Sequence, residues 1–225
     1  MMKRPLLVFD LDGTLADTAP DLMGTLNVIL KREGLEPIPI EAARSLLGAG
    51  ARVLITRGFE RAGRELSREK LNALFADFLS YYEAHIADGS RLFPGVERAL
   101  DRFAGAGFMM AVCTNKMERG SKLLLAKLGI ADRFAAICGQ DTFAIAKPDP
   151  RIFRETVALA GGGPAIMIGD SRADIDTARN AGAPVIAVDF GYTDAPIETF
   201  SPDRVISHFD ELWGAVEALT SRVAG

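Results

Sequence analysis

Cysteine and histidine are scarce in this chain, with two residues of each among 225. Cys113 and Cys138 both stand among apolar residues, so we expect buried, reduced thiols and no disulfide framework. His85 and His208 each stand alone in the sequence, which argues against a histidine-based metal centre or a catalytic triad. Any catalytic chemistry must therefore depend mainly on other side chains.

Long hydrophobic runs and an excess of positive charge are also missing. No stretch approaches the ~18 apolar residues of a membrane span, and the first apolar run stops at Asp10, which is too short for a signal peptide. The formal net charge is −4, which disfavours a general nucleic-acid binder but not a pocket for a small anion. We therefore expect a cytoplasmic protein that binds neither membranes nor nucleic acid.

Short apolar runs recur along the chain, and each is closed by a polar residue or by glycine. They cover residues 6–9, 109–113, 135–138, 165–168, 185–188 and 205–206. Runs of this length and composition are typical of buried strands. Helix-like patterns separate most of them, for example Ile152, Phe153 and Val157. This alternation predicts an α/β fold with a Rossmann-like parallel sheet and helices on both faces.

Residues 17–88 differ, because they contain helical patterns and no convincing strand. Leu22, Leu26, Ile29 and Leu30 share one helical face, and glycines and prolines divide the segment into about four helices. A connection of this length is far longer than the few residues that normally join a strand to a helix. We predict a helical subdomain at 17–88, inserted into a core formed by residues 1–16 and 89–225.

Polar side chains follow four of the predicted strands, at the sheet edge where parallel α/β proteins bind their ligands. In chain order they are Asp10, Asp12, Thr114, Asn115, Lys116, Lys147, Asp170 and Asp174. Because these strand ends are expected to meet, the residues predict one site.

The types of residue in this set suit phosphoryl transfer. Asp10 and Asp12 are two positions apart, so one carboxylate can attack phosphorus while the other handles a proton. Lys147 offers a positive charge for the phosphate, and Thr114 and Asn115 offer a hydroxyl and a backbone amide to the phosphoryl oxygens. Carboxylate ligands without histidine suit Mg²⁺.

The four groups of polar residues that follow these strands, in this order, resemble the motifs of the haloacid dehalogenase superfamily of aspartyl phosphotransferases. The resemblance covers nearly the whole chain, and residues 17–88 occupy the position of that superfamily's C1 cap. It implies a phosphoaspartate on Asp10, with Asp12 as the general acid and base. It also implies Mg²⁺ bound by the carboxylates of Asp10 and Asp170 and the backbone carbonyl of Asp12. Asp174 would lie outside the direct ligands or act through a metal-bound water.

Substrate selection is expected to depend on the helical segment. In the cap loop at residues 48–50, the resemblance suggests a surface that faces the substrate, with Arg52 directly behind it. Arg52 or Lys116 could pair with a substrate carboxylate, although each could equally be a plain surface residue.

Within the superfamily, residues 19–22, 48–50, 93–96 and 114–116 most resemble the phosphoglycolate phosphatases. The leading expectation is hydrolysis of a small phosphorylated substrate, 2-phosphoglycolate, to glycolate and phosphate by a monomer or homodimer. The alternatives are another sugar-phosphate phosphatase or phosphomutase of the superfamily and, more remotely, a non-catalytic binding module on the same fold.

Overall fold

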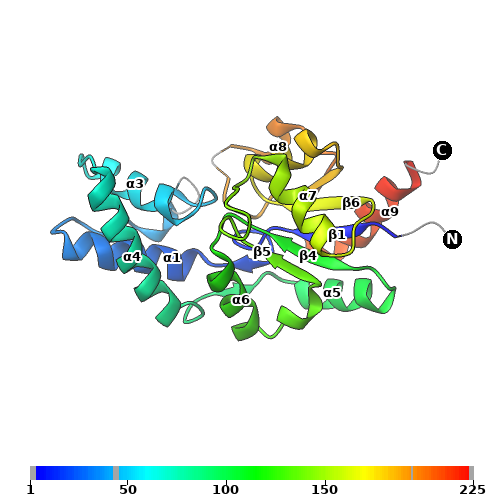
Figure 1. The fold of residues 1–225 in the computed structure, drawn as a ribbon, viewed down its shortest axis with the longest axis horizontal. Helices are drawn as coiled ribbons and strands as arrows, with labels where there is room; N and C mark the ends of the chain where they lie inside the picture. Colours follow the sequence, from blue (N-terminus) through cyan, green and yellow to red (C-terminus); the bar gives the residue numbers. More distant parts are fainter. Residues whose placement is uncertain (1–3, 43–45, 194, 223–225) are drawn as a thin grey trace.

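The computed structural model describes residues 4–42, 46–193 and 195–222. Its main sheet has six parallel strands in the order β5-β4-β1-β6-β7-β8 (Figure 1). The strands are β1 (Leu6–Phe9), β4 (Met110–Cys113), β5 (Ala136–Cys138), β6 (Ala165–Gly169), β7 (Val185–Val188) and β8 (Arg204–Ile206). The sequence prediction is therefore confirmed for every strand of this sheet, to within one residue at each end.

Helices cover both faces of this sheet, as predicted. They are α5 (Val96–Gly105), α6 (Glu118–Lys127), α7 (Pro150–Leu159), α8 (Arg172–Ala181) and α9 (Leu212–Arg222), with single 3-10 turns η2 (Ala131–Arg133), η3 (Ile197–Phe200) and η4 (Phe209–Glu211). In β1, Leu7 and Phe9 belong to one hydrophobic cluster and Leu6 and Val8 to the other. Since successive side chains point to opposite faces, β1 is apolar throughout because both faces are buried.

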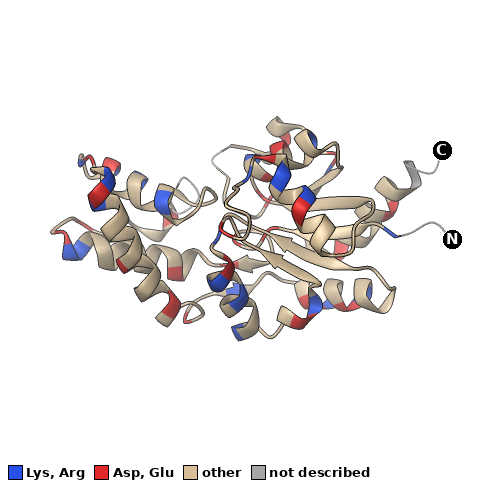
Figure 2. Ribbon diagram, viewed as in Figure 1, with Lys and Arg blue, Asp and Glu red and all other residues tan. Residues whose placement is uncertain are grey.

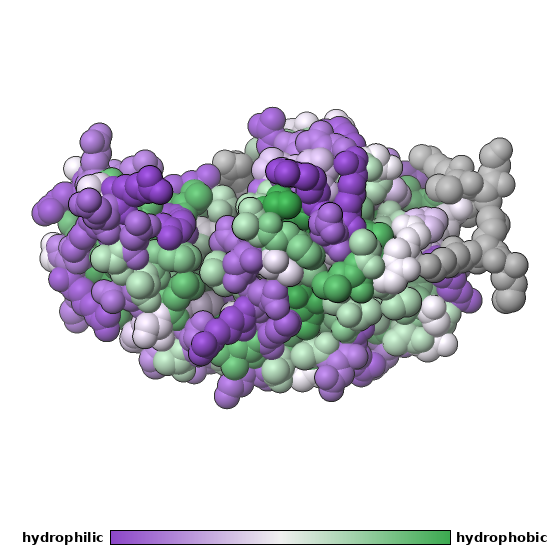
Figure 3. Space-filling model, viewed as in Figure 1, coloured by the Kyte–Doolittle hydropathy of each residue, from purple (hydrophilic) through white to green (hydrophobic). Residues whose placement is uncertain are grey.

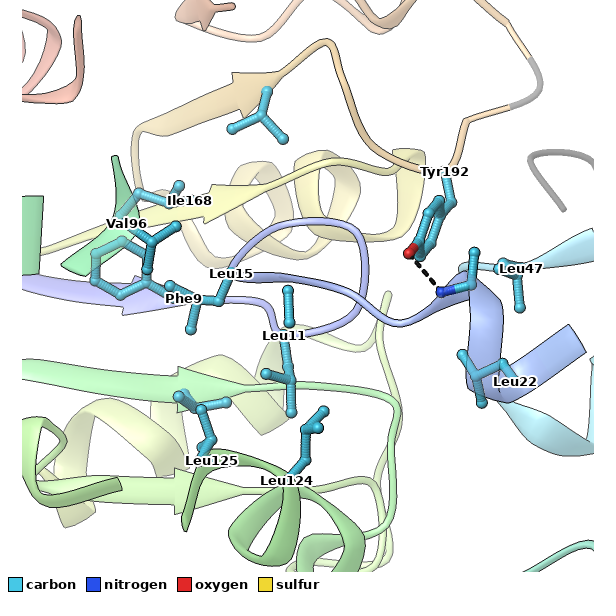
Figure 4. Packing of buried hydrophobic residues seen from close by; sticks show 14 of the residues in the cluster. Phe9, Leu11, Leu15, Leu22, Leu47, Val96, Leu124, Leu125, Ile168 and Tyr192 are labelled. Carbon is cyan, nitrogen blue, oxygen red and sulfur yellow. Dashed lines mark hydrogen bonds between the residues drawn. The ribbon is translucent and has the colours of Figure 1, made fainter. Parts of the chain in front are cut away.

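Each hydrophobic cluster has its own helices. Phe103 of α5 and Leu212 of α9 pack with the cluster that contains Phe9, as does Leu124 of α6 (Figure 4), whereas residues of α7 and α8 pack on the other face. Trp213 stacks on Phe103 with ring centroids 5.1 Å apart, so it packs α9 against α5. Cys113 and Cys138 are buried free thiols, which confirms that prediction.

Residues 17–88, here called the helical insert, lie at one end of the molecule (Figure 1). The insert contains α1 (Ala19–Arg32), the 3-10 turn η1 (Ile40–Ala42), α3 (Ala51–Arg61) and α4 (Arg68–Ala84). Leu26, Phe59 and Phe78 are buried where these helices pack together. The prediction of about four helices falls partly on residues 43–45, which lie outside the described residues. The predicted domain boundaries at 16/17 and 88/89 stay a prediction.

A two-stranded antiparallel sheet at the junction with the insert was not predicted. It pairs β2 (Ala16–Asp17) with β3 (Arg91–Leu92), so the chain enters and leaves the insert side by side. Strands of two residues are too short to produce an alternating pattern of hydrophobicity. They nevertheless fix where the insert joins the core.

The surface is of mixed character. Lys and Arg alternate with Asp and Glu over the outer helices (Figure 2), and hydrophilic residues dominate the outer face of the insert in the space-filling view (Figure 3). Within residues 4–42, 46–193 and 195–222, no helix has the length and hydrophobicity needed to cross a membrane.

Candidate active site

The topology of the main sheet brings three predicted site residues together. Strand β1 lies between β4 and β6, and Asp10, Thr114 and Asp170 directly follow these three strands. Because neighbouring parallel strands end at the same edge, their side chains meet in the crevice where the strand order reverses. The sheet therefore produces the predicted convergence without help from the insert.

A cluster of buried charges occupies this edge. Oxygen atoms of Asp10, Asp170 and Asp174 lie within 4.8 Å of one another, and all three residues are buried. The Lys147 ammonium lies 2.9 Å from Asp10 Oδ1 and 2.6 Å from Asp174 Oδ1, and its side chain is only 1% exposed. Three carboxylates and one ammonium thus share a space from which water is largely excluded.

Neighbouring donors hold two of these carboxylates in place. Asp170 accepts hydrogen bonds from Thr14 Oγ1 at 3.0 Å and from the backbone amide of Tyr192 at 2.6 Å. Asp174, in the first turn of α8, accepts from the amide of Ser171 at 3.1 Å and from its hydroxyl at 2.6 Å. The orientations of Asp170 and Asp174 are therefore set before any ligand binds.

Gly13 allows the chain to turn over Asp170. Its φ of +85° is in the left-handed region, and a Cβ atom there would lie 2.8 Å from the carboxyl carbon of Asp170. Any other residue at position 13 would be strained and would also collide with the cluster. Glycine at this position therefore lets the chain turn sharply directly after Asp12.

The charges in the cluster shift one another's protonation. Burial raises the pKa of Asp10 to about 6, with Asp174 adding to the effect and Lys147 opposing it. Burial, Asp10 and Asp174 raise the pKa of Asp170 well above its ordinary value. Burial alone would lower the pKa of Lys147, but Asp10 and Asp174 outweigh it and raise that pKa. The cluster therefore has more negative charge than its single ammonium can offset.

The cluster fits a divalent cation. Asp10 Oδ1 is buried and accepts no hydrogen bond of normal geometry from any residue that the structure describes, although Lys147 lies at ion-pair distance. Three ionised carboxylates and one ammonium leave two negative charges, which is the charge that a divalent cation offsets. Oxygen-only donors favour a hard cation over zinc or copper. Asp10, Asp170 and Asp174 thus form a candidate metal site.

We expect the metal-free protein to lose stability as the pH rises, and Asp170→Asn to reduce this loss. Between the unfolded pKa of about 3.9 and the raised folded values, the folded state binds more protons than the unfolded chain, so the free energy of unfolding falls with rising pH. An Asn carries no charge, and its oxygen and amide can still pair with the Tyr192 amide and Thr14. Thermal unfolding with a chelator should show a melting temperature for Asp170→Asn about 3–8 °C above wild type near pH 8.

The difference should shrink as the pH falls, because the raised pKa of Asp170 lets its carboxyl group take up a proton in the folded protein. Asp132→Asn makes the same chemical change at an exposed carboxylate and should follow wild type throughout. If the melting temperature of Asp170→Asn follows that of wild type at every pH, the charge of Asp170 does not destabilise the metal-free protein.

Lys116 is deeply buried and links the core to the insert. Its ammonium lies 2.9 Å and 3.1 Å from the two carboxylate oxygens of Asp12, and it donates a 2.7 Å hydrogen bond to the hydroxyl of Tyr82 on α4. Burial raises the pKa of Tyr82 to about 12, so its hydroxyl keeps its proton near neutral pH. The plain-surface alternative for Lys116 is therefore wrong.

Asn115 has a structural contact that the sequence did not suggest. Its side-chain oxygen accepts from the Lys147 amide at 2.8 Å, and its side-chain nitrogen donates to the Lys147 carbonyl at 3.2 Å. This pair of bonds occupies the Asn115 side chain and holds the backbone of Lys147, while phosphate binding by the backbone amide of Asn115 stays a prediction. The Thr114 hydroxyl oxygen accepts a 3.2 Å bond from the Lys116 amide, and its own proton can be donated to a ligand.

A small cavity of about 50 Å³ lies between the insert and the sheet edge. The core and the insert both line it, with Asp10, Asp12, Thr114, Asn115, Lys116, Met117, Gly120 and Gln140 from the core and Leu22, Leu47, Gly48, Gly50, Ala51, Leu54, Phe78, Leu79, Tyr82 and Glu83 from the insert. The loop at 48–50 closes over the core, since a Cβ at Gly50 would lie 3.3 Å from the carbonyl oxygen of Asn115. The loop therefore faces the site, as expected.

Arg52 does not join this cavity. It is exposed on α3, where its guanidinium donates to Asn72 Oδ1 at 2.8 Å and lies 4.1 Å from the ring centre of Phe75. The first helical turn after Gly50 directs it along the outer face of the insert. This location does not support the predicted pairing of Arg52 with a substrate carboxylate.

Comparison with known proteins gives relatives along the full length. The chain is 49% identical to a phosphoglycolate phosphatase of Mesorhizobium japonicum, over all of both chains. It is 47% identical to a phosphoglycolate phosphatase of Caulobacter vibrioides, over 90% of this chain and 86% of the relative.

The fold also has a counterpart among solved structures. A crystal structure described as a predicted phosphoglycolate phosphatase from Haemophilus somnus superimposes with a TM-score of 0.88 at 30% identity, covering 96% of this chain and 99% of the other. The family model for haloacid dehalogenase-like hydrolases matches residues 7–188, which include every residue of the charged cluster. This chain therefore belongs to the haloacid dehalogenase-like hydrolases and resembles the phosphatases among them.

Proposed function

We propose that this enzyme hydrolyses a small phosphomonoester through a phosphoaspartate on Asp10, with Mg²⁺ as its cofactor. The observation that carries the proposal is the contact of one buried ammonium, that of Lys147, with the carboxylates of Asp10 and Asp174 beside Asp170. A carboxylate can approach a phosphate dianion only where positive charge offsets the repulsion. Bound Mg²⁺ would supply further positive charge to the phosphoryl oxygens.

The first step is attack by an Asp10 oxygen on phosphorus. The new bond joins that oxygen to phosphorus while the bond from phosphorus to the ester oxygen breaks, and Asp12 gives a proton to the departing alcohol. Thr114 and the backbone amide of Asn115 donate hydrogen bonds to the phosphoryl oxygens. In the second step Asp12 takes a proton from water, which attacks phosphorus and releases Asp10 and inorganic phosphate.

The helical insert acts in this proposal as a cap that keeps bulk water out of the site. Hydrolysis of phosphate monoesters without a catalyst is among the slowest reactions known, and electrostatic stabilisation is strongest in a water-excluded site. The close approach of Gly50, in the loop at 48–50, to the carbonyl oxygen of Asn115 supports this role. So does the ion pair of Glu83 on α4 with Arg119 on α6, at 3.1 Å.

We propose 2-phosphoglycolate as the substrate. A cavity of about 50 Å³ suits a very small ester, and curated relatives carry the name phosphoglycolate phosphatase. Among the cavity-lining residues in the described ranges, Lys116 has the one positively charged side chain. A substrate carboxylate could pair with this ammonium, which would leave Asp12 free to carry the proton.

The test compares 2-phosphoglycolate with 2-hydroxyethyl phosphate, in which a neutral CH₂OH replaces the carboxylate. Wild type with Mg²⁺ should prefer the acid by about 10- to 100-fold in kcat/KM, the value of one charge-assisted hydrogen bond. Lys116→Met should bring this ratio close to one, because kcat/KM for 2-phosphoglycolate falls when the partner of its carboxylate is lost, whereas 2-hydroxyethyl phosphate has no carboxylate to pair with Lys116. A chelator should abolish hydrolysis by wild type.

Hexose phosphates complete the panel. A preference for hexose phosphates, or conversion of one into its isomer, would establish the sugar-phosphate alternatives in place of 2-phosphoglycolate. Absence of turnover on every ester with Mg²⁺ present would favour the non-catalytic module. Lys122→Met removes an exposed ammonium of α6 and should leave the ratio at its wild-type value.

A further inference from the structure

The first turn of α1 holds both connections between the core and the insert. The outgoing chain leaves β2 at Asp17 and enters α1, while the returning chain passes Gly89 and Ser90 before β3. Asp21 of α1 accepts hydrogen bonds from the amides of Gly89 and Ser90, at 2.8 Å and 2.7 Å, and from the Ser90 hydroxyl at 2.6 Å. The start of α1 and the returning chain therefore behave as one unit.

The start of α1 is capped by a residue of the core. Helix N-termini usually gain a hydrogen bond from a Ser, Thr, Asp or Asn at the cap position, but Thr18 makes no such bond. Its hydroxyl is buried and has no hydrogen-bond partner among the described residues. Instead the amides of Thr18 and Ala19 donate to the hydroxyl of Tyr192, at 2.7 Å and 2.8 Å. Figure 4 shows the Tyr192 hydroxyl directed at the start of α1.

The Tyr192 hydroxyl is fully used at this position. It donates its proton to Asp17 Oδ1 at 2.5 Å, and it accepts the two amide bonds of α1. A hydroxyl can make one donor bond and two acceptor bonds. Burial and the neighbouring Asp17 raise the pKa of Tyr192, so the phenol stays protonated.

The other end of Tyr192 reaches the charged cluster. Its backbone amide donates to Asp170 Oδ2 at 2.6 Å. Its ring lies against the turn after Asp12, where a Cβ on Gly13 would come within 2.9 Å of the ring. Its carbonyl oxygen faces the insert, 3.3 Å from where a Cβ on Gly48 would be. Tyr192 thus contacts the charged cluster, the turn after Asp12, the loop at 48–50 and the chain that enters the insert.

We propose that Tyr192 is a positioning residue, whose hydroxyl fixes the start of α1 relative to the Asp170 carboxylate. A movement of the insert must then either break the three hydrogen bonds of the phenol or pull on the backbone that orients Asp170. The position of the insert and the geometry of the carboxylates are set together. This inference rests on phosphomonoester hydrolysis by the enzyme, but not on the identity of the substrate.

The test is Tyr192→Phe, which removes the hydroxyl and keeps the ring and the backbone amide. Exchange of the Thr18 amide hydrogen, measured by NMR, should become at least about tenfold faster, because its acceptor is lost. The Ala19 amide keeps Asp17 Oδ1 as an acceptor at 3.3 Å and should change less. With the ester of the panel above that wild type hydrolyses fastest, and with saturating Mg²⁺, kcat/KM should fall at least about tenfold. The dissociation constant for Mg²⁺ without substrate, measured by calorimetry, should rise about tenfold, as for other residues that orient a metal ligand.

Tyr81→Phe is the matched control, because it removes a tyrosine hydroxyl from α4 at a position outside the cavity lining. It should leave all three quantities within about twofold of wild type. If Tyr192→Phe speeds amide exchange but leaves Mg²⁺ affinity and kcat/KM unchanged, the phenol only caps α1 and the proposal is wrong. Unchanged amide exchange would overturn it as well.

Asp17→Ala offers a second variant if Tyr192→Phe does not fold, since it removes the acceptor of the phenol and leaves the core intact. It should weaken Mg²⁺ binding and lower kcat/KM in the same direction. Full Mg²⁺ affinity in Asp17→Ala would refute the coupling. An inactive wild-type enzyme would instead refute the proposed function, while the amide exchange result would still decide whether the phenol holds α1.

Discussion

Asp10→Asn should abolish phosphomonoester hydrolysis, lowering kcat by at least about 10⁴-fold while the protein stays folded. The amide is nearly the same size as the carboxylate but cannot form the bond to phosphorus. Since burial raises the pKa of Asp10 to about 6, removal of its charge should not destabilise the metal-free protein near neutral pH. Phosphate release and thermal unfolding, measured on the same sample, separate lost chemistry from lost structure.

The phosphoaspartate itself can be observed by rapid acid quenching and mass spectrometry of peptides. Wild type should show a phosphoryl adduct on the peptide that contains Asp10, and Asp10→Asn should show none. Asp101→Asn, on the exposed face of α5, makes the same change away from the site and should retain full activity. If Asp10→Asn keeps more than about one hundredth of wild-type kcat, another group is the nucleophile.

The core of this site could be predicted because each strand of a buried parallel sheet appears in the sequence as a short run of apolar residues that ends at a polar residue. Both faces of β1 are buried, so all four of its residues are apolar and the strand ends visibly at Asp10. The same holds for β4 before Thr114 and for β6 before Asp170. Since strand ends share one edge, the order of polar residues along the chain was enough to predict that they meet.

The contacts across the junction could not be predicted in this way. Tyr82 fits the apolar face of α4, and the helical spacing of apolar residues along α4 does not indicate that the Tyr82 hydroxyl meets Lys116. Tyr192 lies in a loop after β7, 174 positions from the amide of Thr18 that it accepts. Such pairs depend on how the insert packs on the core, and a single sequence contains no periodic signal for that packing.

The failure of the Arg52 prediction has the same origin. Its charge and its position after the glycine loop made it a plausible partner for a substrate carboxylate, but helix rotation decides which side chain faces the cavity. In the structure Ala51 and Leu54 of α3 line the cavity, while Arg52 points to Asn72. Residues that select substrates through the insert are therefore the ones that sequence patterns identify least well.

Lys147→Met should lower activity by at least about 10³-fold and also destabilise the metal-free protein by about 3–5 kcal/mol near pH 8. The Lys147 side chain is buried against Asp10 and Asp174, so its removal leaves two buried carboxylates without their counter-charge. The loss of stability should shrink as the pH falls towards 5, because the orphaned carboxylates take up protons and fold as neutral acids. Thermal or denaturant unfolding across this range measures the effect.

The double variant Lys147→Met with Asp174→Asn separates stability from catalysis. With one of the two orphaned charges removed, most of the lost stability should return, because a buried neutral amide costs far less than a buried anion. Hydrolysis should stay at the level of Lys147→Met, since the ammonium next to Asp10 is then missing. If Lys147→Met alone unfolds like wild type near pH 8, the ammonium is not what balances these carboxylates. If the double variant regains activity, the role of Lys147 is to shield Asp174 and not to bind phosphate.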